Sequence, residues 1–259
     1  MRKCAIIGLV MGVLLACEGA SALSIYDIQY STGPDYQSPY LGQTVSVTGG
    51  VVTKVFVGGS TKITIQDPTL GDAWAGVQLV FSDPSQAAGI VRGDQIDIAG
   101  GVVGEYRGNT QINMADSTSS VTINSSGNDV TPLVVSVAEI PNPANHDLSE
   151  PYEFMLLRVE HVTVGLMDLG KNSDNYELFN GEGLCWASDY ANEDLAPGEI
   201  YYVLPGQAFD SVTGYLEQYQ RTNPDWDYYQ LLPRDAEDYV PAGSPAEETS
   251  WGAVKSLFR

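Results

Sequence analysis

Three short stretches of this 259-residue chain share one pattern, in which a turn precedes an alternating strand that ends in glycine. Residues 42–49 and 93–100 both read Gly, then Gln or Asp, then alternating Val or Ile, then Gly, and residues 206–214 repeat the pattern with one residue more. Alternation at period two indicates a strand, and a glycine at its end marks a bulge or a sharp bend. Strands that bend in this way are needed to close a small barrel. The pattern therefore predicts an all-β fold made of small closed barrels.

The order of strand and turn signals predicts two five-stranded Greek-key barrels of the OB type in tandem. The first barrel occupies residues 24–140, with a hairpin at Gly58 and Gly59. Residues 141–151 contain three prolines and are typical of a linker. The same element order restarts in the second barrel at 152–240, so the chain is interpreted as a degenerate tandem repeat. Within the barrels we expect a lead-in segment at 24–31, helical turns at 85–91 and 189–195, a long bent strand at 200–220, and a closing helical turn at 233–238.

The first 22 residues are typical of a secretory signal peptide. Arg2 and Lys3 precede an apolar run at 5–16, and residues 20–22 (Ala-Ser-Ala) form a cleavage site. Lipidation at Cys17 is the alternative. No other apolar run approaches membrane length, so we expect a mature chain without a transmembrane segment, secreted or held at the cell surface or in the periplasm. Only Cys185 remains after cleavage, which excludes an internal disulfide and favours a bacterial export route.

The end of the chain, residues 241–259, is predicted to be a linker followed by a short tail. Trp251, Val254, Leu257 and Phe258 would share one face of a short helix. Such a helix is marginal alone in water. We expect this segment to be dispensable for folding and relevant, if anything, to export or surface attachment.

The charge of the chain argues against a nucleic-acid partner. The formal net charge is −21 at pH 7, and no basic stripe is visible in either barrel. Nucleic-acid binding gains most of its affinity from Lys and Arg that neutralise phosphates. A protein or carbohydrate ligand is therefore the preferred partner, and nucleic acid the less favoured one.

Motifs for catalysis, cofactors or metals are absent from the sequence. It has no phosphate-cradling glycine loop, no nucleophile elbow, no zinc motif and no calcium loop. His146 and His161 are isolated in sequence, and the acidic groups at 225–227 and 235–238 are interpreted as solvated loops. We expect no enzyme activity, no cofactor and no metal.

Two groups of residues are candidates for ligand binding. OB folds bind ligands on the face of strands two and three, between the loops that join strands one and two and strands four and five. In the first barrel this face would carry Lys54, Phe56, Lys62, Thr64, Gln66, Gln78, Tyr106 and Arg107. The second barrel has an aromatic patch of Tyr215, Tyr219, Trp226, Tyr228 and Tyr229. These rings would stack on a ligand, or they would stabilise their own hairpin as cross-strand pairs.

The segments at 152–164 and 231–238 resemble OB-fold modules of secreted bacterial proteins, which often lie beside endonuclease/exonuclease/phosphatase domains. The segment at 65–68, with Gly93, Asp94 and Gly100, is similar to the same module. The resemblance implies a secreted tandem of OB folds without the catalytic domain. The resulting hypothesis is an exported, non-catalytic binding or scaffold protein. The alternative is a nucleic-acid-binding accessory module related to secreted nucleases.

The signal-peptide assignment predicts the mature N-terminus. Expression with export in a bacterial host should give a protein that begins at Leu23, because the small residues of 20–22 fit the cleavage site. Intact-mass spectrometry and N-terminal sequencing measure this directly. A chain that begins at a lipid-modified Cys17, or that keeps Met1, would contradict the assignment.

Overall fold

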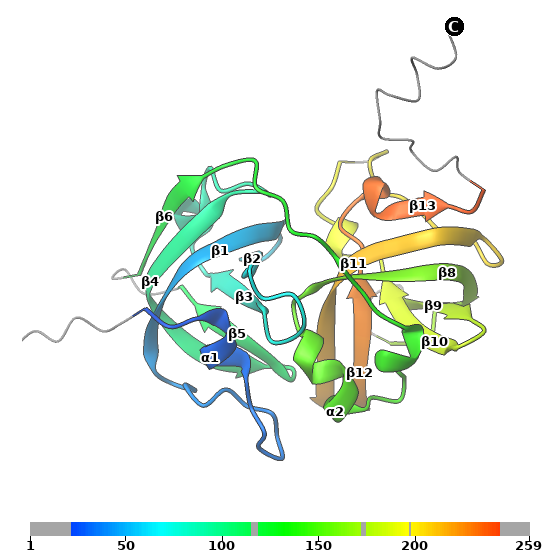
Figure 1. Cartoon of the computed structure of the whole chain (residues 1–259), viewed down its shortest axis with the longest axis horizontal. Coiled ribbons are helices and arrows are strands. Elements are labelled where there is room, and N and C mark those ends of the chain that lie inside the picture. The colour runs from blue at the N-terminus through cyan, green and yellow to red at the C-terminus, as the bar shows by residue number, and fades with distance from the viewer. Residues whose placement is uncertain (1–21, 115–118, 172–174, 197, 244–259) are drawn as a thin grey trace, which may run out of the picture.

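The alternating apolar residues form two separate β-sheets in the computed structural model, which describes residues 22–114, 119–171, 175–196 and 198–243. Each sheet curls into a barrel, and the two barrels lie side by side (Figure 1). Among the described residues, no strand pairing joins one sheet to the other. Each barrel also has its own buried core of aliphatic and aromatic side chains.

The first barrel has the strand order β1-β2-β3-β5-β4, and β4 pairs back onto β1 to close the ring. Only the β3–β5 pair is parallel among its described pairings. A sixth strand, β6, pairs antiparallel with β4. A short helix precedes β1, and a 3₁₀ turn, η1, precedes β4. The elements are α1 (Ile25–Gln29), β1 (Thr44–Val57), β2 (Thr61–Gln66), β3 (Gly76–Phe81), η1 (Pro84–Ala87), β4 (Gln95–Tyr106), β5 (Asn109–Asn113) and β6 (Ser120–Ser125).

The second barrel repeats this order as β8-β9-β10-β12-β11, with β11 pairing back onto β8 and with β10 and β12 parallel. The strands are β7 (Leu133–Val134), β8 (Leu156–Met167), β9 (Asn175–Asn180), β10 (Gly183–Ser188), β11 (Ala208–Thr222), β12 (Asp225–Leu232) and β13 (Tyr239–Pro241). The helical elements are η2 (Val137–Glu139), α2 (His146–Ser149), η3 (Glu150–Tyr152), η4 (Tyr190–Asn192) and η5 (Ala236–Asp238). The prediction of two OB-type barrels in tandem is therefore confirmed.

The glycines that end the repeated sequence pattern lie where the first barrel bends. Gly49 and Gly100 have φ of 75° and 76°, in the left-handed region that favours glycine. The register between β1 and β4 shifts between Val47 and Gly50, next to the first of these glycines. A bulge of this kind increases the local twist of a strand, which lets a long strand pair with two neighbours around a closed barrel.

Several boundaries differ from the sequence-based ones. Residues 133–140 belong with the second sheet, because β7 pairs with β8 and Val137 is buried in the second core. The predicted linker at 141–151 contains α2 and the start of η3, and the chain segment after β6 crosses the junction to reach it (Figure 1). The lead-in segment is a helix with a Ser24 capping box. Residues 200–204 are not a strand.

Some predictions fall outside the described residues. These are the signal peptide up to residue 21, with Cys17, and the tail from residue 244. Within the described ranges, every helix falls short of the length and apolar character that crossing a membrane requires.

The two barrels pack through the outer face of β2 and β3 of the first barrel. A Cβ added at Gly76 would lie 2.2 Å from the carbonyl carbon of Phe154, so the two backbones are in direct contact. The Gln66 side chain accepts a hydrogen bond from the backbone N–H of Leu156 at 2.7 Å. Asn109 exchanges two hydrogen bonds with the backbone of Gln218, at 2.7 and 3.0 Å. The buried side chains of Gln66 and Asn109 thus find partners across the junction, as a tight interface requires.

Replacing Gly76 with alanine should loosen this junction. The new methyl group has no space against the Phe154 backbone, so we expect Gly76→Ala to lower the free energy of unfolding by about 1–3 kcal/mol. Gly71→Ala is the matched control, because a Cβ there meets nothing within 4 Å. Thermal and denaturant unfolding of the two variants measure the difference. Equal stabilities would mean that the backbones of the two barrels are not in contact at this point.

Candidate functional site

The ligand face predicted for the first barrel is largely covered by the second barrel. The Lys54 ammonium forms an ion pair with Asp194 at 2.9 Å, and the two side chains are only 9% and 8% exposed. The Phe56 ring packs against Tyr190 of η4, with centroids 4.9 Å apart. Thr64 and Gln66 are buried. Lys54, Phe56 and Gln66 contact the second barrel and Thr64 is buried, which corrects the prediction that these four residues line an open ligand groove.

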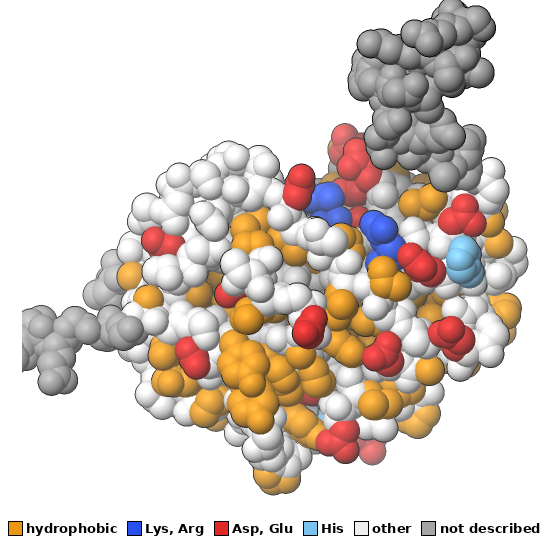
Figure 2. Space-filling view, in the orientation of Figure 1, with side chains coloured by type: hydrophobic (Ala, Val, Ile, Leu, Met, Phe, Trp, Pro, Cys, Tyr) orange, Lys and Arg blue, Asp and Glu red, His pale blue; other side chains and the backbone are white. Residues whose placement is uncertain are grey.

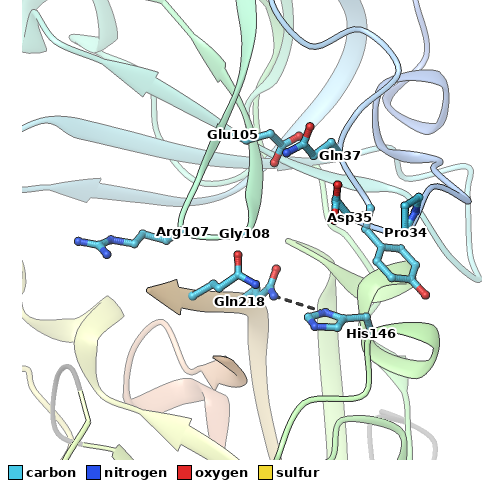
Figure 3. A pocket seen from close by; sticks show the side chains of 10 residues that line it. Pro34, Asp35, Gln37, Glu105, Arg107, Gly108, His146 and Gln218 are labelled. Carbon is cyan, nitrogen blue, oxygen red and sulfur yellow. Dashed lines mark hydrogen bonds between the residues drawn. The ribbon is translucent and has the colours of Figure 1, made fainter. Parts of the chain in front are cut away.

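The other four predicted residues of the first barrel lie at the rim of the junction. Lys62 and Gln78 line a small cavity against the second barrel, together with the turn that joins β4 to β5. That turn carries Tyr106, which is 56% exposed, and Arg107. Figure 3 shows the Arg107 side chain directed away from Asp35 and His146. It lies instead over the rings of Tyr106 and Tyr219, at 5.4 and 5.5 Å.

The β11–β12 hairpin of the second barrel has two chemically different faces. Side chains alternate along a strand, and the register pairs Tyr219 with Tyr228 and Arg221 with Trp226 on one face. Gln220 and Asp227 are paired on the opposite face. Tyr229 also lies on that opposite face and is buried, and Tyr215 is buried against Phe154. Of the five predicted aromatic residues, the structure therefore brings together Tyr219, Trp226 and Tyr228.

Aromatic rings and basic side chains interleave on the first face of this hairpin. Tyr219 stacks on Tyr228 with centroids 5.6 Å apart. Arg221 lies 5.0 Å from the Trp226 ring centroid. Lys171 reaches the same ring at 5.5 Å and the ring of Trp186, on β10, at 5.8 Å. We call this surface the aromatic–cationic strip; it comprises Tyr106, Arg107, Lys171, Trp186, Tyr219, Arg221 and Trp226.

The basic residues of the strip differ from most others because they are not neutralised by acids. Among the described residues, Lys54, Arg92 and Arg234 form ion pairs, whereas Arg107, Lys171 and Arg221 do not. Lys62, beside the strip, is also without an ion pair in the described ranges and lies 5.4 Å from the Tyr190 ring centroid. Cations held over aromatic faces keep their charge available to an anion on the outer side.

The strip occupies the ligand-binding position of the second OB barrel. Its members come from the first inter-strand loop (Lys171), the third strand (Trp186) and the hairpin of strands four and five (Trp226). OB folds bind ligands at this position. Lys171, Arg221 and Trp186 were not among the candidates predicted from the sequence. Alternation along β10 places Trp186 on the face opposite the buried Cys185, which was the available signal, whereas the two basic residues are isolated in the sequence.

The opposite face of the hairpin lines a polar cavity of about 260 Å³ under the loop at residues 34–37 (Figure 3). His146 of α2 contacts Asp227 through Nε2 at 3.0 Å and the Tyr229 hydroxyl through Nδ1 at 2.8 Å. Gln218 donates to Asp227 at 2.8 Å and lies 3.4 Å from His146 Nδ1. The Tyr229 hydroxyl donates in turn to Glu150. The cavity is therefore bordered by a continuous polar network.

Two buried carboxyl groups, Glu150 and Glu153, and the half-buried Glu105 lie beside this network at the junction of the barrels. Burial raises the pKa of Glu105, raises that of Glu150 to about 7, and raises that of Glu153 well above its usual value. The hydrogen bond to Asp227 raises the pKa of His146. Glu153 accepts hydrogen bonds from Gln29 and from the Thr110 backbone, both at 3.1 Å. Proximity of like charges in a dry site favours the protonated acids.

A third cleft, of about 570 Å³, lies on the other side of the junction. On the face drawn in Figure 2, basic side chains gather where the barrels meet, among acidic ones. The arginines that line the cleft are Arg92, Arg158 and Arg234, and two of them are paired with Asp235 and Asp238. The charges of Arg92 and Arg234 are therefore neutralised by acids of the protein itself. In the part of the chain that the structure describes, no group of three or more His, Cys, Asp or Glu side chains could hold a metal ion.

Comparison with known proteins gives matches at the level of the fold. No protein-family model matches the chain, and no curated protein sequence matches it. An OB domain from Methanosarcina mazei is 18% identical, with a TM-score of 0.28, over 35% of this chain and 81% of that one. Fission yeast Pot1, solved with single-stranded DNA, is 11% identical, with a TM-score of 0.35, over 92% and 93%. A murine DNA-binding protein, solved with double-stranded DNA, is 10% identical, with a TM-score of 0.33, over 74% and 96%. The strand order of the chain itself defines a tandem OB-fold protein.

The buried acids predict that stability falls as the pH rises. The folded protein holds the proton of Glu150 up to about pH 7, whereas the unfolded chain releases it near 4.5. Between these values the folded state binds more protons, so the free energy of unfolding decreases with increasing pH, by on the order of 2 kcal/mol for this group.

Glu150→Gln should therefore lose less stability than the wild type between pH 5 and pH 8, since its amide stays neutral while its oxygen can still accept from Tyr229. Melting temperatures across this range measure the effect. Glu160→Gln, at an exposed position, is the control and should follow the wild type. His146 acts in the same direction, so part of the slope should remain in the variant. Parallel curves for Glu150→Gln and the wild type would show that Glu150 is ionised in the folded protein at neutral pH.

Proposed function

We propose that this protein is an exported, non-catalytic OB-fold binding protein that binds single-stranded nucleic acid along the aromatic–cationic strip. The observation that carries the proposal is the interleaving of Tyr219, Trp186 and Trp226 with basic side chains that no described acid neutralises. A nucleic-acid-binding module was the alternative hypothesis from the sequence. The proposal adopts that alternative, although the net charge of the chain disfavours a nucleic-acid partner.

The two kinds of side chain match the two parts of a single strand. Every base has a flat face that can stack on an aromatic ring, and such stacking contributes about 1–3 kcal/mol per base. The phosphates between the bases need cations at intervals, which Arg107, Lys171 and Arg221 provide along the strip. A duplex hides the faces of its bases, so the strip fits single strands better than double-stranded DNA.

The net charge of −21 limits the affinity without excluding the interaction. Repulsion between exposed charges is screened beyond about 10 Å at 0.1 M salt, so the charges nearest to the ligand weigh most. The charged side chains of the strip itself are Arg107, Lys171 and Arg221, and the acid Glu217 lies in the wall of an adjoining cavity. We therefore infer moderate affinity, with a local positive surface on an acidic protein.

A carbohydrate ligand is the second candidate, and the acidity of the protein favours it. Sugar rings also stack on tryptophan and tyrosine, and a neutral chain would not be repelled. The two candidates differ in salt dependence, because only a polyanion releases condensed counterions when it binds cations.

Removing one ring of the strip should weaken the binding of single-stranded DNA. We expect Trp226→Ala to reduce the affinity for a fluorescein-labelled dT oligomer by about 5- to 150-fold, the equivalent of one stacked base. Fluorescence anisotropy at low salt measures this. Tyr202→Ala is the matched control, since Tyr202 is 69% exposed and belongs to none of the strands or turns that form the strip; its affinity should stay at the wild-type level.

Removing one charge should change the salt dependence of the same binding. Each phosphate contact to a single strand contributes about 0.7 to the slope of log affinity against log salt. Lys171→Ala should lower that slope by about this amount, and Arg92→Ala, whose charge is already paired with Asp235, should not. No binding of the dT oligomer by the wild type, together with salt-independent binding of a neutral polysaccharide that needs Trp226, would replace the proposal with the carbohydrate one.

A further inference from the structure

A small cavity continues the aromatic–cationic strip into the junction of the barrels. Its volume is about 230 Å³, roughly eight times the ~30 Å³ that one water molecule occupies in the liquid. Tyr106, Arg107 and Tyr219 belong both to the strip and to the wall of the cavity. Tyr190 forms another aromatic part of the wall. A ligand lying on the strip can therefore place one flat ring inside the cavity.

The side chain of Gln78 lines this cavity. The residue is 4% exposed, and its amide makes no side-chain hydrogen bond to the described residues. Asn109, which also lines the cavity, is different because its amide is used by the backbone of Tyr106 and Gln218. Amide groups of Gln can both donate and accept hydrogen bonds, and the Gln78 amide has neither role toward another described side chain. Gln78 is therefore placed to hydrogen-bond a ligand that enters the cavity.

A carboxyl group and an ammonium group also line the cavity. Glu217 is 7% exposed, and one of its oxygens accepts a hydrogen bond from Gln230 at 3.0 Å; the other has no partner among the described residues. Lys62 lies 3.4 Å from the Tyr190 hydroxyl. Burial raises the pKa of Glu217 and the nearby charge of Lys62 opposes that rise, which places the two groups within electrostatic reach of each other.

We propose that this cavity is a base-recognition pocket that receives one guanine of the bound strand. Guanine presents two neighbouring donors, N1–H and the N2 amino group, beside the acceptor O6. A carboxylate such as Glu217 can accept from both donors, while Lys62 and Gln78 can donate to O6 and N7. Adenine and thymine present fewer matched groups, and cytosine offers the carboxylate only its N4 amino group. The inference rests on the proposed function and adds base selectivity to it.

The test compares oligomers that differ in one base. Labelled dT oligomers carry at their centre guanine, adenine, cytosine or hypoxanthine, which lacks the N2 amino group. Fluorescence anisotropy gives the affinity of each relative to unmodified dT. We expect guanine to be preferred by about 5- to 150-fold, the effect of one good bidentate contact, and hypoxanthine to lose part of that preference.

Variants connect the preference to the pocket. Gln78→Ala and Glu217→Gln should lower the ratio of guanine to dT affinity toward one. Gln43→Ala, an exposed glutamine far from the cavity, should keep the wild-type ratio. Melting temperatures check that the Glu217 variant is folded. Trp226→Ala, on the strip, should lower the affinity for every oligomer by a similar factor. The guanine oligomer should still bind more tightly than dT.

The outcomes separate the two proposals. Oligomer binding with equal affinity for all four bases overturns the pocket and leaves the strip. If the wild type binds no oligomer, the proposed function fails, and the pocket is tested with guanosine alone by isothermal titration calorimetry on the full chain. Saturable guanosine binding that is lost in Gln78→Ala then supports the pocket, and absence of guanosine binding overturns it.

Discussion

Gly76 lets the backbone of β3 touch the backbone at Phe154, and this contact determines which surfaces of the protein are free. Any side chain at this position would push the barrels apart. With the barrels in contact, Gln66 and Asn109 can reach backbone groups across the junction, and Lys54 can pair with Asp194 in a nearly dry site. A buried pair like this one needs good geometry to offset the cost of desolvation. The ligand face of the first OB barrel is therefore used for packing, and that of the second remains open.

The β11–β12 hairpin connects this architecture with function because its two faces have different environments. The period of two along a strand assigns Tyr219, Arg221 and Trp226 to one face, where they meet solvent and the turn that carries Arg107. The other face meets His146 and the buried acids, where protons are held by burial. One short hairpin thus carries a candidate binding surface and, opposite to it, a pH-sensitive part of the barrel junction.

The site also shows why net charge is a weak guide to a local surface. A value of −21 argues against a polyanion when charges are averaged over the chain. In the structure, Arg92 and Arg234 are paired with acids, whereas Arg107, Lys171 and Arg221 are not paired with any described acid. The three unpaired residues come from a turn, a loop and a strand that are far apart in the sequence. Only their positions in space make a positive strip.

The sequence by itself determined the two barrels, because period-two alternation and glycines at strand ends are local signals that a strand must satisfy wherever it packs. It also identified Tyr219 and Trp226, since both lie on one hairpin. The tertiary structure decided that Lys54 and Phe56 are interface residues and that Lys171 and Trp186 join the strip. It also moved residues 133–140 into the second barrel. These outcomes depend on which surfaces of two similar barrels meet. That choice is made by close backbone approach and hydrogen bonds between distant segments, which leave no pattern within any one segment.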